Sequence, residues 1–200
     1  AVQARELTTS QTILQNQIER VGDHLFKQGA MVIPGQVSID TSYYAVKLTS
    51  IDSSNTLAQF TTGTILTGGT SGVTAEITKT AATDGTDPDT IFVKYSKTGT
   101  NNTADVFSDS ETLTGTNSDS VSLSCVVSTT ATGSAAGVQA GVYYINGFFV
   151  QVDSSTLILD KYTNTPSYRV GFTVTESFVT PSDDSSLNDN AAGSSNVNAP

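Results

Sequence analysis

The sequence predicts a mainly β protein that begins with one long N-terminal α-helix, and three observations support this fold class. Residues 4–28 carry apolar side chains three and four positions apart, the spacing of one face of a helix. The rest of the 200-residue chain is rich in Thr, Ser, Gly and Val, which is typical of short strands joined by turns. Several of its segments alternate apolar with polar residues, as half-buried strands do. We therefore expect antiparallel β-modules, sandwich-like or barrel-like, joined by linkers rich in Gly, Ser and Thr.

The predicted helix carries a narrow apolar seam with one polar position. Assigned to heptads, the a and d positions are Leu7, Gln11, Leu14, Ile18, Val21 and Leu25. A seam of this kind packs against the same seam of another copy, so we expect these six residues to form the interface of a homo-oligomer. The flanking e and g positions hold no opposite charges, so the sequence encodes no charge pairing between copies there.

A second interpretation of the same helix stays open. Ile13 and Phe26 widen the apolar stripe beyond a strict seam, which favours a helix that lies on its own β-domain. In either case Gly22 is the weak point of the helix interior, and Gly29 is a natural stop.

The remainder of the chain is expected to form short strands. Their predicted ranges are 30–33, 37–39, 43–51, 73–78, 91–95, 121–128, 142–152, 156–160 and 168–179. The clearest feature is a hairpin over 142–152, because Asn146 and Gly147 supply the two positive-φ residues of a type I′ turn.

One internal similarity links two parts of the β body. The segment from Phe60 to Gly68 aligns with the segment from Phe107 to Gly115, at an offset of 47 residues. A Ser/Thr-rich alternating segment follows each copy. We expect a small antiparallel module of about five or six strands, since two copies are too few for a solenoid.

Composition shifts suggest four regions. Residues 1–29 form the oligomerisation helix, residues 30–57 and 130–180 a β-rich core domain, and residues 58–129 an inserted β-module. The stretch 129–141 consists mainly of small residues and is expected to be a linker. Residues 181–200 have too few large apolar residues for a core of their own, so we expect an extended arm or connector.

The charge of the chain disfavours two kinds of partner. Its 19 acidic and 9 basic side chains give a net charge of −10, and the excess lies on the β part because residues 1–30 are balanced. An acidic surface repels nucleic-acid phosphates and anionic membranes. The sequence also lacks a run of 18 apolar residues and a signal peptide. We expect no nucleic-acid partner and no membrane insertion.

Residue types that perform chemistry are few. Cys125 is the one cysteine and lies in an apolar run, so we expect a small buried residue rather than a nucleophile. His24 is the one histidine, which excludes a histidine cluster for metal. The glycine string 67–72 is followed by neither Gly-Lys-Ser/Thr nor a helix, so it fails as a phosphate loop and is expected to be a β-turn.

Acidic pairs are the remaining candidates for catalysis or calcium binding. Glycoside hydrolysis needs two carboxylates, and the candidates are Asp183 with Asp184, Asp87 with Asp89, and Asp105 with Asp109. All lie in turn-like, solvated settings, and their spacing does not match an EF-hand loop. We expect no catalytic residue, no cofactor and no metal site.

Four aromatic residues in the predicted hairpin raise the alternative of a sugar platform. They are Tyr143, Tyr144, Phe148 and Phe149. Because alternate residues of a strand face opposite sides, we expect one of each pair in the core and the other exposed or at an interface.

The opening segment also resembles a known family. The residues AVQARELTTSQTILQNQIER at 1–20, continued by 22–27 and Gly29, look like a family of virion structural proteins of large tailed bacteriophages, especially those that infect cyanobacteria. Members are assigned to the tail baseplate or its fibres. The segments 142–152, 168–181 and 190–193 are similar to that family as well, while 58–130 looks like a variable insert. The turn at 67–72 resembles turns common in phage tail proteins.

This resemblance implies a non-enzymatic component of the virion tail, assembled in the host cytoplasm, with no catalytic residues to carry over. It implies a baseplate wedge or fibre-attachment protein that self-associates, with a trimer favoured, and that docks to other tail or baseplate proteins. The alternative is a receptor-binding or glycan-binding adhesin module of a tail fibre, with the β-insert as the adhesin.

Overall fold

The structure, a computed structural model, describes residues 4–180 and 182–187. Its elements are one helix, α1 (Ala4–Leu25), ten strands and two short 3-10 turns, η1 (Leu57–Gln59) and η2 (Ser185–Leu187). The prediction of a mainly β chain with one N-terminal helix and antiparallel sheets is confirmed. The chain forms two compact units, one of residues 36–139 and 154–168 and the other of residues 1–35, 140–153 and 169–200. The four regions suggested by composition stay a prediction.

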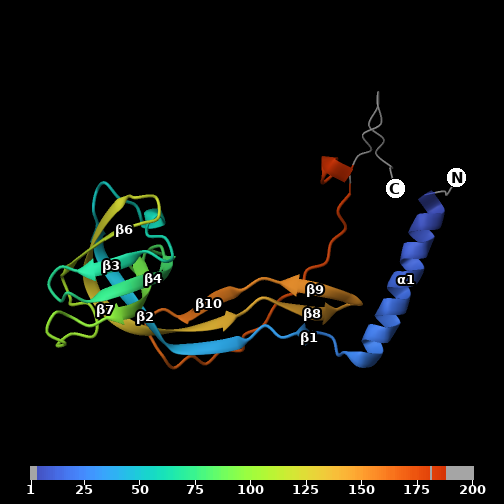
Figure 1. The fold of residues 1–200 in the computed structure, drawn as a ribbon, viewed down its shortest axis with the longest axis horizontal. Helices are drawn as coiled ribbons and strands as arrows, with labels where there is room; N and C mark the ends of the chain where they lie inside the picture. Colours follow the sequence, from blue (N-terminus) through green and yellow to red (C-terminus); the bar gives the residue numbers. More distant parts are fainter. Residues whose placement is uncertain (1–3, 181, 188–200) are drawn as a thin grey trace. The chain divides into compact units, whose positions relative to one another are not determined.

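The first unit, hereafter the barrel unit, is a closed ring of antiparallel strands (Figure 1). Its strands are β2 (Val37–Ile51), β3 (Ile65–Gly68), β4 (Thr74–Ala81), β5 (Thr90–Lys97), β6 (Thr112–Thr116), β7 (Ser122–Val138) and β10 (Ser155–Asp160). The sheet order is β10-β7-β2-β5-β4-β3-β6, and β6 pairs in turn with β7. Six strands therefore close on themselves, which leaves no open edge in the ring itself. The seventh strand, β10, pairs with the C-terminal part of β7, at residues 134–138.

Strand alternation fills the inside of the ring. On β6 and β7 the inward positions are Leu113, Leu123, Cys125 and Val127, and polar residues alternate with them. The buried cluster as a whole is Val46, Leu48, Phe60, Leu66, Val73, Ala75, Ile77, Ile91, Val93, Phe107, Leu113, Leu123, Cys125 and Val127. Because a strand repeats every two residues, one face of each strand supplies this core and the other faces outward.

The two copies of the internal repeat are related by a pseudo-two-fold axis of the ring. Exchanging β2, β3 and β4 with β5, β6 and β7 reproduces the same order of neighbours. Two cross-strand pairs lie on the axis, Ala45 with Phe92 and Thr67 with Thr114, and the members of each pair are 47 residues apart. The aligned residues Phe60 and Phe107 are both buried. The ring thus has six strands in two equivalent halves, and one of these strands, β2, precedes the segment 58–129.

Most of the stretch of small residues at 129–141 belongs to a strand, so the prediction of a linker is wrong for residues 129–138, although the division between the two units at 139–140 lies within this stretch. Residues up to Val138 continue β7, which pairs with β2 on one side and β10 on the other. Small side chains are required because atoms of neighbouring segments lie close by. A Cβ on Gly133 would lie 2.5 Å from the carbonyl oxygen of Lys161, and one on Gly137 would lie 2.8 Å from Oγ of Ser38.

The second unit, hereafter the helical unit, contains α1 and a three-stranded sheet. Its strands β1 (Ala30–Ile33), β8 (Gly141–Ile145) and β9 (Phe148–Val152) have the order β1-β8-β9. The predicted hairpin is confirmed, since Ile145 pairs with Phe148 and both turn residues, Asn146 and Gly147, have positive φ. The helix ends at Leu25, three residues before the predicted end at 28.

The strand predicted at 168–179 is absent from the described structure, which has irregular backbone from 163 to 180. Val170, Phe172 and Val174 do alternate with polar residues or glycine, but their side chains are exposed. Alternation gives a segment one apolar face, but a strand also needs a neighbouring strand to bond its backbone N–H and C=O groups. No strand of the described chain pairs with this segment. Of the predicted arm, residues 181 and 188–200 lie outside the described residues.

Candidate self-association surface

The C-terminal half of α1 rests on its own sheet through Tyr144. The ring lies against Gly22, where an added Cβ would overlap with it, so the glycine that weakens the helix is the one residue that lets Tyr144 approach. Its hydroxyl donates to the carbonyl oxygen of Glu19 at 3.0 Å and to Oδ1 of Asp23 at 2.9 Å. Burial and the Asp23 carboxylate raise the pKa of Tyr144 to about 12. The contact therefore keeps its proton and its geometry throughout the neutral range.

Aromatic packing completes this attachment. Phe26 lies 5.7 Å from the ring centre of Tyr144 and 5.9 Å from that of Phe149. Just beyond the helix, Gly29 has φ +77° and its N–H donates to the carbonyl oxygen of Tyr144 at 2.8 Å. The second interpretation, in which the helix lies on its own β-domain, therefore fits the C-terminal end of the helix, where Gly22 and Phe26 contact Tyr144.

The rest of the apolar seam is not covered by the described chain. Leu14, Ile18, Val21 and Leu25 are 56, 51, 59 and 66% exposed. An isolated exposed Leu is ordinary, but four on one stripe form a contiguous apolar surface, which marks an interaction site in soluble proteins. The structure brings these four residues together in one open groove of about 300 Å³ that also contains Phe26 and Phe149.

Gln11, a fifth predicted interface residue, lies outside this groove. Gln11 is exposed on the helix one turn before Leu14. The side chain of Leu7 lies outside the described residues. Ile13, the residue that suggested a wider stripe, is 52% exposed and lines a separate hollow with Leu14 on the N-terminal half of the helix. The assignment of all six residues to an oligomer interface stays a prediction.

The hairpin aromatics contribute Phe149 to this surface. The expected split of each pair is wrong, because Tyr143 and Tyr144 are both buried and Phe148 and Phe149 are both exposed. The reason is position in the sheet. The central strand β8 is covered on both faces, by the helix over Tyr144 and by Phe172 at 5.6 Å from Tyr143, whereas β9 is an edge strand.

A second hollow lies on the other side of β9. Phe148, Val150 and Val152 line it from the strand, and Phe172 and Val174 line it from the irregular segment after 168. Its volume is about 310 Å³. The helical unit therefore presents apolar residues on the helix, on the edge strand and on the irregular segment.

The residues considered for catalysis are dispersed. Cys125 is buried in the ring, and burial raises the pKa of its thiol to about 12, so it stays a neutral core residue. His24 lies exposed on the helix. Asp87 is bonded to Lys161, whereas Asp89 accepts from the N–H of Thr83.

Another of the acidic pairs, Asp183 and Asp184, caps a local turn. Asp183 accepts from the N–H and hydroxyl of Thr180, and Asp184 accepts from the N–H of Ser186, and these bonds lower the pKa of both carboxyls. Among the described residues, none of the His, Cys, Asp and Glu side chains gather in threes at a metal-binding spacing.

Sequence reasoning missed one buried carboxylate, Glu111. Its oxygens accept four hydrogen bonds, from the N–H of Thr70, the N–H and hydroxyl of Ser71, and the N–H of Ser108, at 2.6 to 3.0 Å. Burial opposes ionisation, but these bonds win and hold the pKa of Glu111 below its usual 4.5. The glycine string 67–72 therefore does bind an anion through its backbone, and that anion is a side chain of the same barrel unit.

In the part of the chain that the structure describes, no helix has the length and apolar character needed to cross a membrane. No protein-family model, curated protein or solved structure matches the chain.

Proposed function

We propose that this chain is a structural component of a bacteriophage tail, a baseplate wedge or fibre-attachment protein, that acts by self-association and by docking to other virion proteins. One observation carries the self-association: the seam residues Leu14, Ile18, Val21 and Leu25 lie side by side in a groove and are more than half exposed. The tail assignment rests on the resemblance of residues 1–29. The protein works in the virion tail, without catalysis, after assembly in the host cytoplasm.

Association of several copies is the physical use of such a seam. Full burial of an apolar side chain of this size contributes about 1.5–3 kcal/mol, whereas association costs about 4–15 kcal/mol in lost freedom of motion. One residue cannot offset that cost, but a seam of four or more on every subunit can. A trimer is favoured, with the three helices joined along the seam and Phe149 at its edge.

Charge placed in the seam tests the proposal directly. Leu14→Asp with Ile18→Asp puts two carboxylates one turn apart in the groove, and we expect the wild-type trimer to become a monomer in sedimentation velocity. The matched control is Thr12→Asp with Asn16→Asp, which adds the same charges at the same spacing on exposed positions outside the groove. This control should leave the sedimentation coefficient unchanged.

Two results would count against the proposal. The first is a wild-type chain that stays monomeric at every concentration, and the second is a seam variant with the mass of the wild type. The tail assignment is tested separately, by a low-resolution map of the intact particle with an antibody bound to this chain, and label at any site other than the tail would refute it.

A further inference from the structure

The barrel unit has two pseudo-equivalent crevices, one at each end of the pairing between β2 and β5. This pairing is short and runs from Tyr44 opposite Val93 to Lys47 opposite Thr90, and it includes the pair Ala45 and Phe92. Beyond it β2 pairs only with β7, and β5 only with β4. The pseudo-two-fold axis passes through the pair Ala45 and Phe92, so residues of β2 and β5 that are 47 positions apart are equivalent, and the axis relates the two ends of this pairing.

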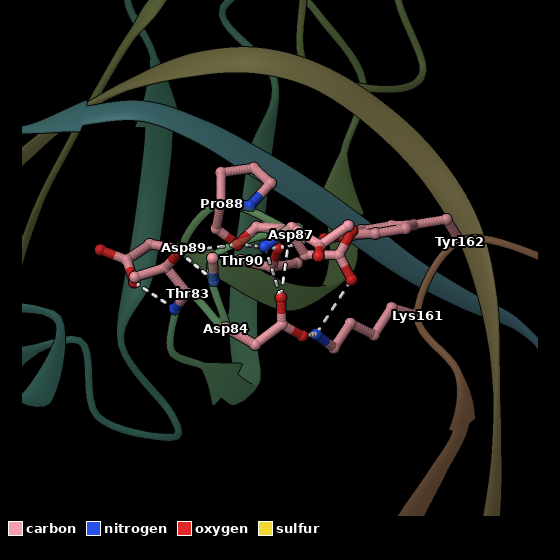
Figure 2. Close-up of polar contacts among 10 residues, drawn as sticks. Thr83, Asp84, Asp87, Pro88, Asp89, Thr90, Lys161 and Tyr162 are labelled. Atoms are coloured by element: carbon pink, nitrogen blue, oxygen red, sulfur yellow. Dashed lines mark hydrogen bonds and ion pairs between the residues drawn. The ribbon is translucent and has the colours of Figure 1, made fainter.

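The first crevice is occupied by two residues of the same chain, Lys161 and Tyr162 (Figure 2). The ammonium group of Lys161 lies 2.8 Å from Oδ2 of Asp84 and 3.1 Å from Oδ2 of Asp87. The hydroxyl of Tyr162 lies 2.8 Å from Oγ1 of Thr90. Nζ of Lys47 lies 3.7 Å above the centre of the Tyr162 ring, a cation–π contact. This crevice thus binds a basic residue followed by an aromatic residue.

The second crevice is an open cavity of about 500 Å³ with a matching set of groups. Asp40, Tyr43 and Lys94 line it. Each lies 47 positions from a residue of the first crevice, namely Asp87, Thr90 and Lys47, although Asp40 belongs to β2 and Asp87 to the turn before β5. Asp105 also lines it and supplies a second carboxylate, as Asp84 does in the first crevice. Asp40, Lys94 and Asp105 are exposed. Residues with two carboxylates and one ammonium group therefore line a cavity that the described chain leaves empty. The hydroxyl of Tyr43 already accepts from Oγ1 of Thr78 at 3.0 Å, and Oδ1 of Asp40 accepts from the N–H of Ser42 at 2.8 Å.

We propose that the second crevice binds an extended peptide segment of a neighbouring protein, in which a Lys or Arg precedes an aromatic residue. The basic side chain lies between Asp40 and Asp105, and the ring lies beneath Lys94. The occupied crevice is the precedent for this chemistry within the same fold. The net charge of −10 assists it, because an acidic chain attracts a basic segment. This surface lies on the barrel unit and is separate from the helix seam.

The probe is the occupant of the first crevice, supplied as a separate molecule. A capped, fluorescent hexapeptide of residues 159–164, LDKYTN, is titrated into the full-length chain and followed by anisotropy. We expect saturable binding that weakens as salt is raised, since the contacts are partly exposed ion pairs. The same peptide with glutamate in place of its lysine should not bind.

Protein variants assign the binding to the second crevice. Asp40→Asn and Asp105→Asn should each weaken the peptide about two- to fivefold, the range for exposed ion pairs. Asp119→Asn makes the same charge change on an exposed residue outside the cavity, and it should have no effect.

Three outcomes would overturn the proposal. One is the absence of saturable binding by a folded chain. Another is that Asp84→Asn abolishes binding of the peptide while Asp40→Asn leaves it unchanged, which would mean that the peptide exchanges with Lys161 in the first crevice. The third is a neutral oligosaccharide that binds in place of the peptide and is lost in Tyr43→Ala, which would make the cavity a sugar site.

Discussion

The two units differ in how far their apolar residues are buried. Of the 20 buried hydrophobic residues in the described chain, 18 belong to the barrel unit, and of the 21 exposed large hydrophobic residues, 15 belong to the helical unit. The barrel unit closes its sheet and fills the interior with its own side chains. The helical unit keeps a small sheet, a helix and an irregular segment whose apolar residues face outward.

If the seam joins copies of the chain as proposed, this difference predicts which substitutions act on folding and which act on association. We expect a closed ring with a filled interior to be stable without a partner, because its strands have neighbours and its own apolar side chains fill the core. In a unit that exposes a contiguous apolar stripe, these residues stabilise the protein only when another surface covers them. We therefore expect substitutions in the barrel unit to act on the free energy of unfolding, and substitutions on the seam to act on association.

The largest expected effect is the loss of a core aromatic from the ring. Phe60→Ala and Phe107→Ala each empty a buried position, and such changes cost about 3–5 kcal/mol of unfolding free energy. Leu25→Ala on the exposed seam should change it by no more than about 0.5 kcal/mol. Urea unfolding measures all three in the Leu14→Asp, Ile18→Asp background, which removes the contribution of association. A cost for Leu25→Ala that equals that of Phe60→Ala would abolish the distinction between the units.

A smaller effect is expected from the buried carboxylate of the ring. Glu111→Gln keeps the shape of the side chain but turns an NH₂ group toward a donor, so we expect a loss of about 1.5–3 kcal/mol, the range for hydrogen bonds to a charged group. The folded pKa of Glu111 lies below its usual 4.5, so its stabilisation is complete above pH 4.5. It is lost as the pH falls from 4.5 through the folded pKa.

The difference between wild type and Glu111→Gln should therefore shrink on acidification. Urea unfolding at pH 7 and at several values below pH 4.5 measures it. Asp109→Asn is the matched control, because Asp109 is an exposed carboxylate two positions away in the same loop, and it should show a small difference at neutral pH. A difference for Glu111→Gln that stays constant down to pH 3 would contradict the role of its charge.

Much of the fold follows from local signals in the sequence. The spacing of Leu14, Ile18 and Leu25 predicts the helix, and Asn146-Gly147 predicts the hairpin, because both depend on neighbours within a few positions. The similarity of the segments at Phe60 and Phe107 predicts a six-stranded module to within one strand. Closure of the ring is different, since the pairing of β6 with β7 depends on register across the whole unit.

The failures have a common cause, which is contact between distant segments. The stretch 129–141 has the composition of a linker, but Gly133 is small because the backbone at Lys161 crosses it. The segment 168–179 has the alternation of a strand but no partner strand in the described chain. Glu111 lies 40 positions from Ser71, so nothing near it in the sequence marks it as buried.

The smallest expected effect is at Gly22, where the helical unit resembles the barrel unit because its residues are packed. Gly22→Ala raises helix propensity by about 1 kcal/mol, but the added Cβ overlaps with the ring of Tyr144, and overpacking of this kind costs about 1–3 kcal/mol. We expect a net loss of about 1 kcal/mol, measured as reduced protection of the amides of residues 19–26 in hydrogen exchange. In a Tyr144→Leu background the overlap is removed, so Gly22→Ala should raise protection instead. Gly171→Ala, where an added Cβ meets nothing within 4 Å, is the control and should leave protection unchanged. Greater protection in the single variant Gly22→Ala would show that Tyr144 does not hold the helix, and the exposed seam would then belong to a helix free to dock elsewhere.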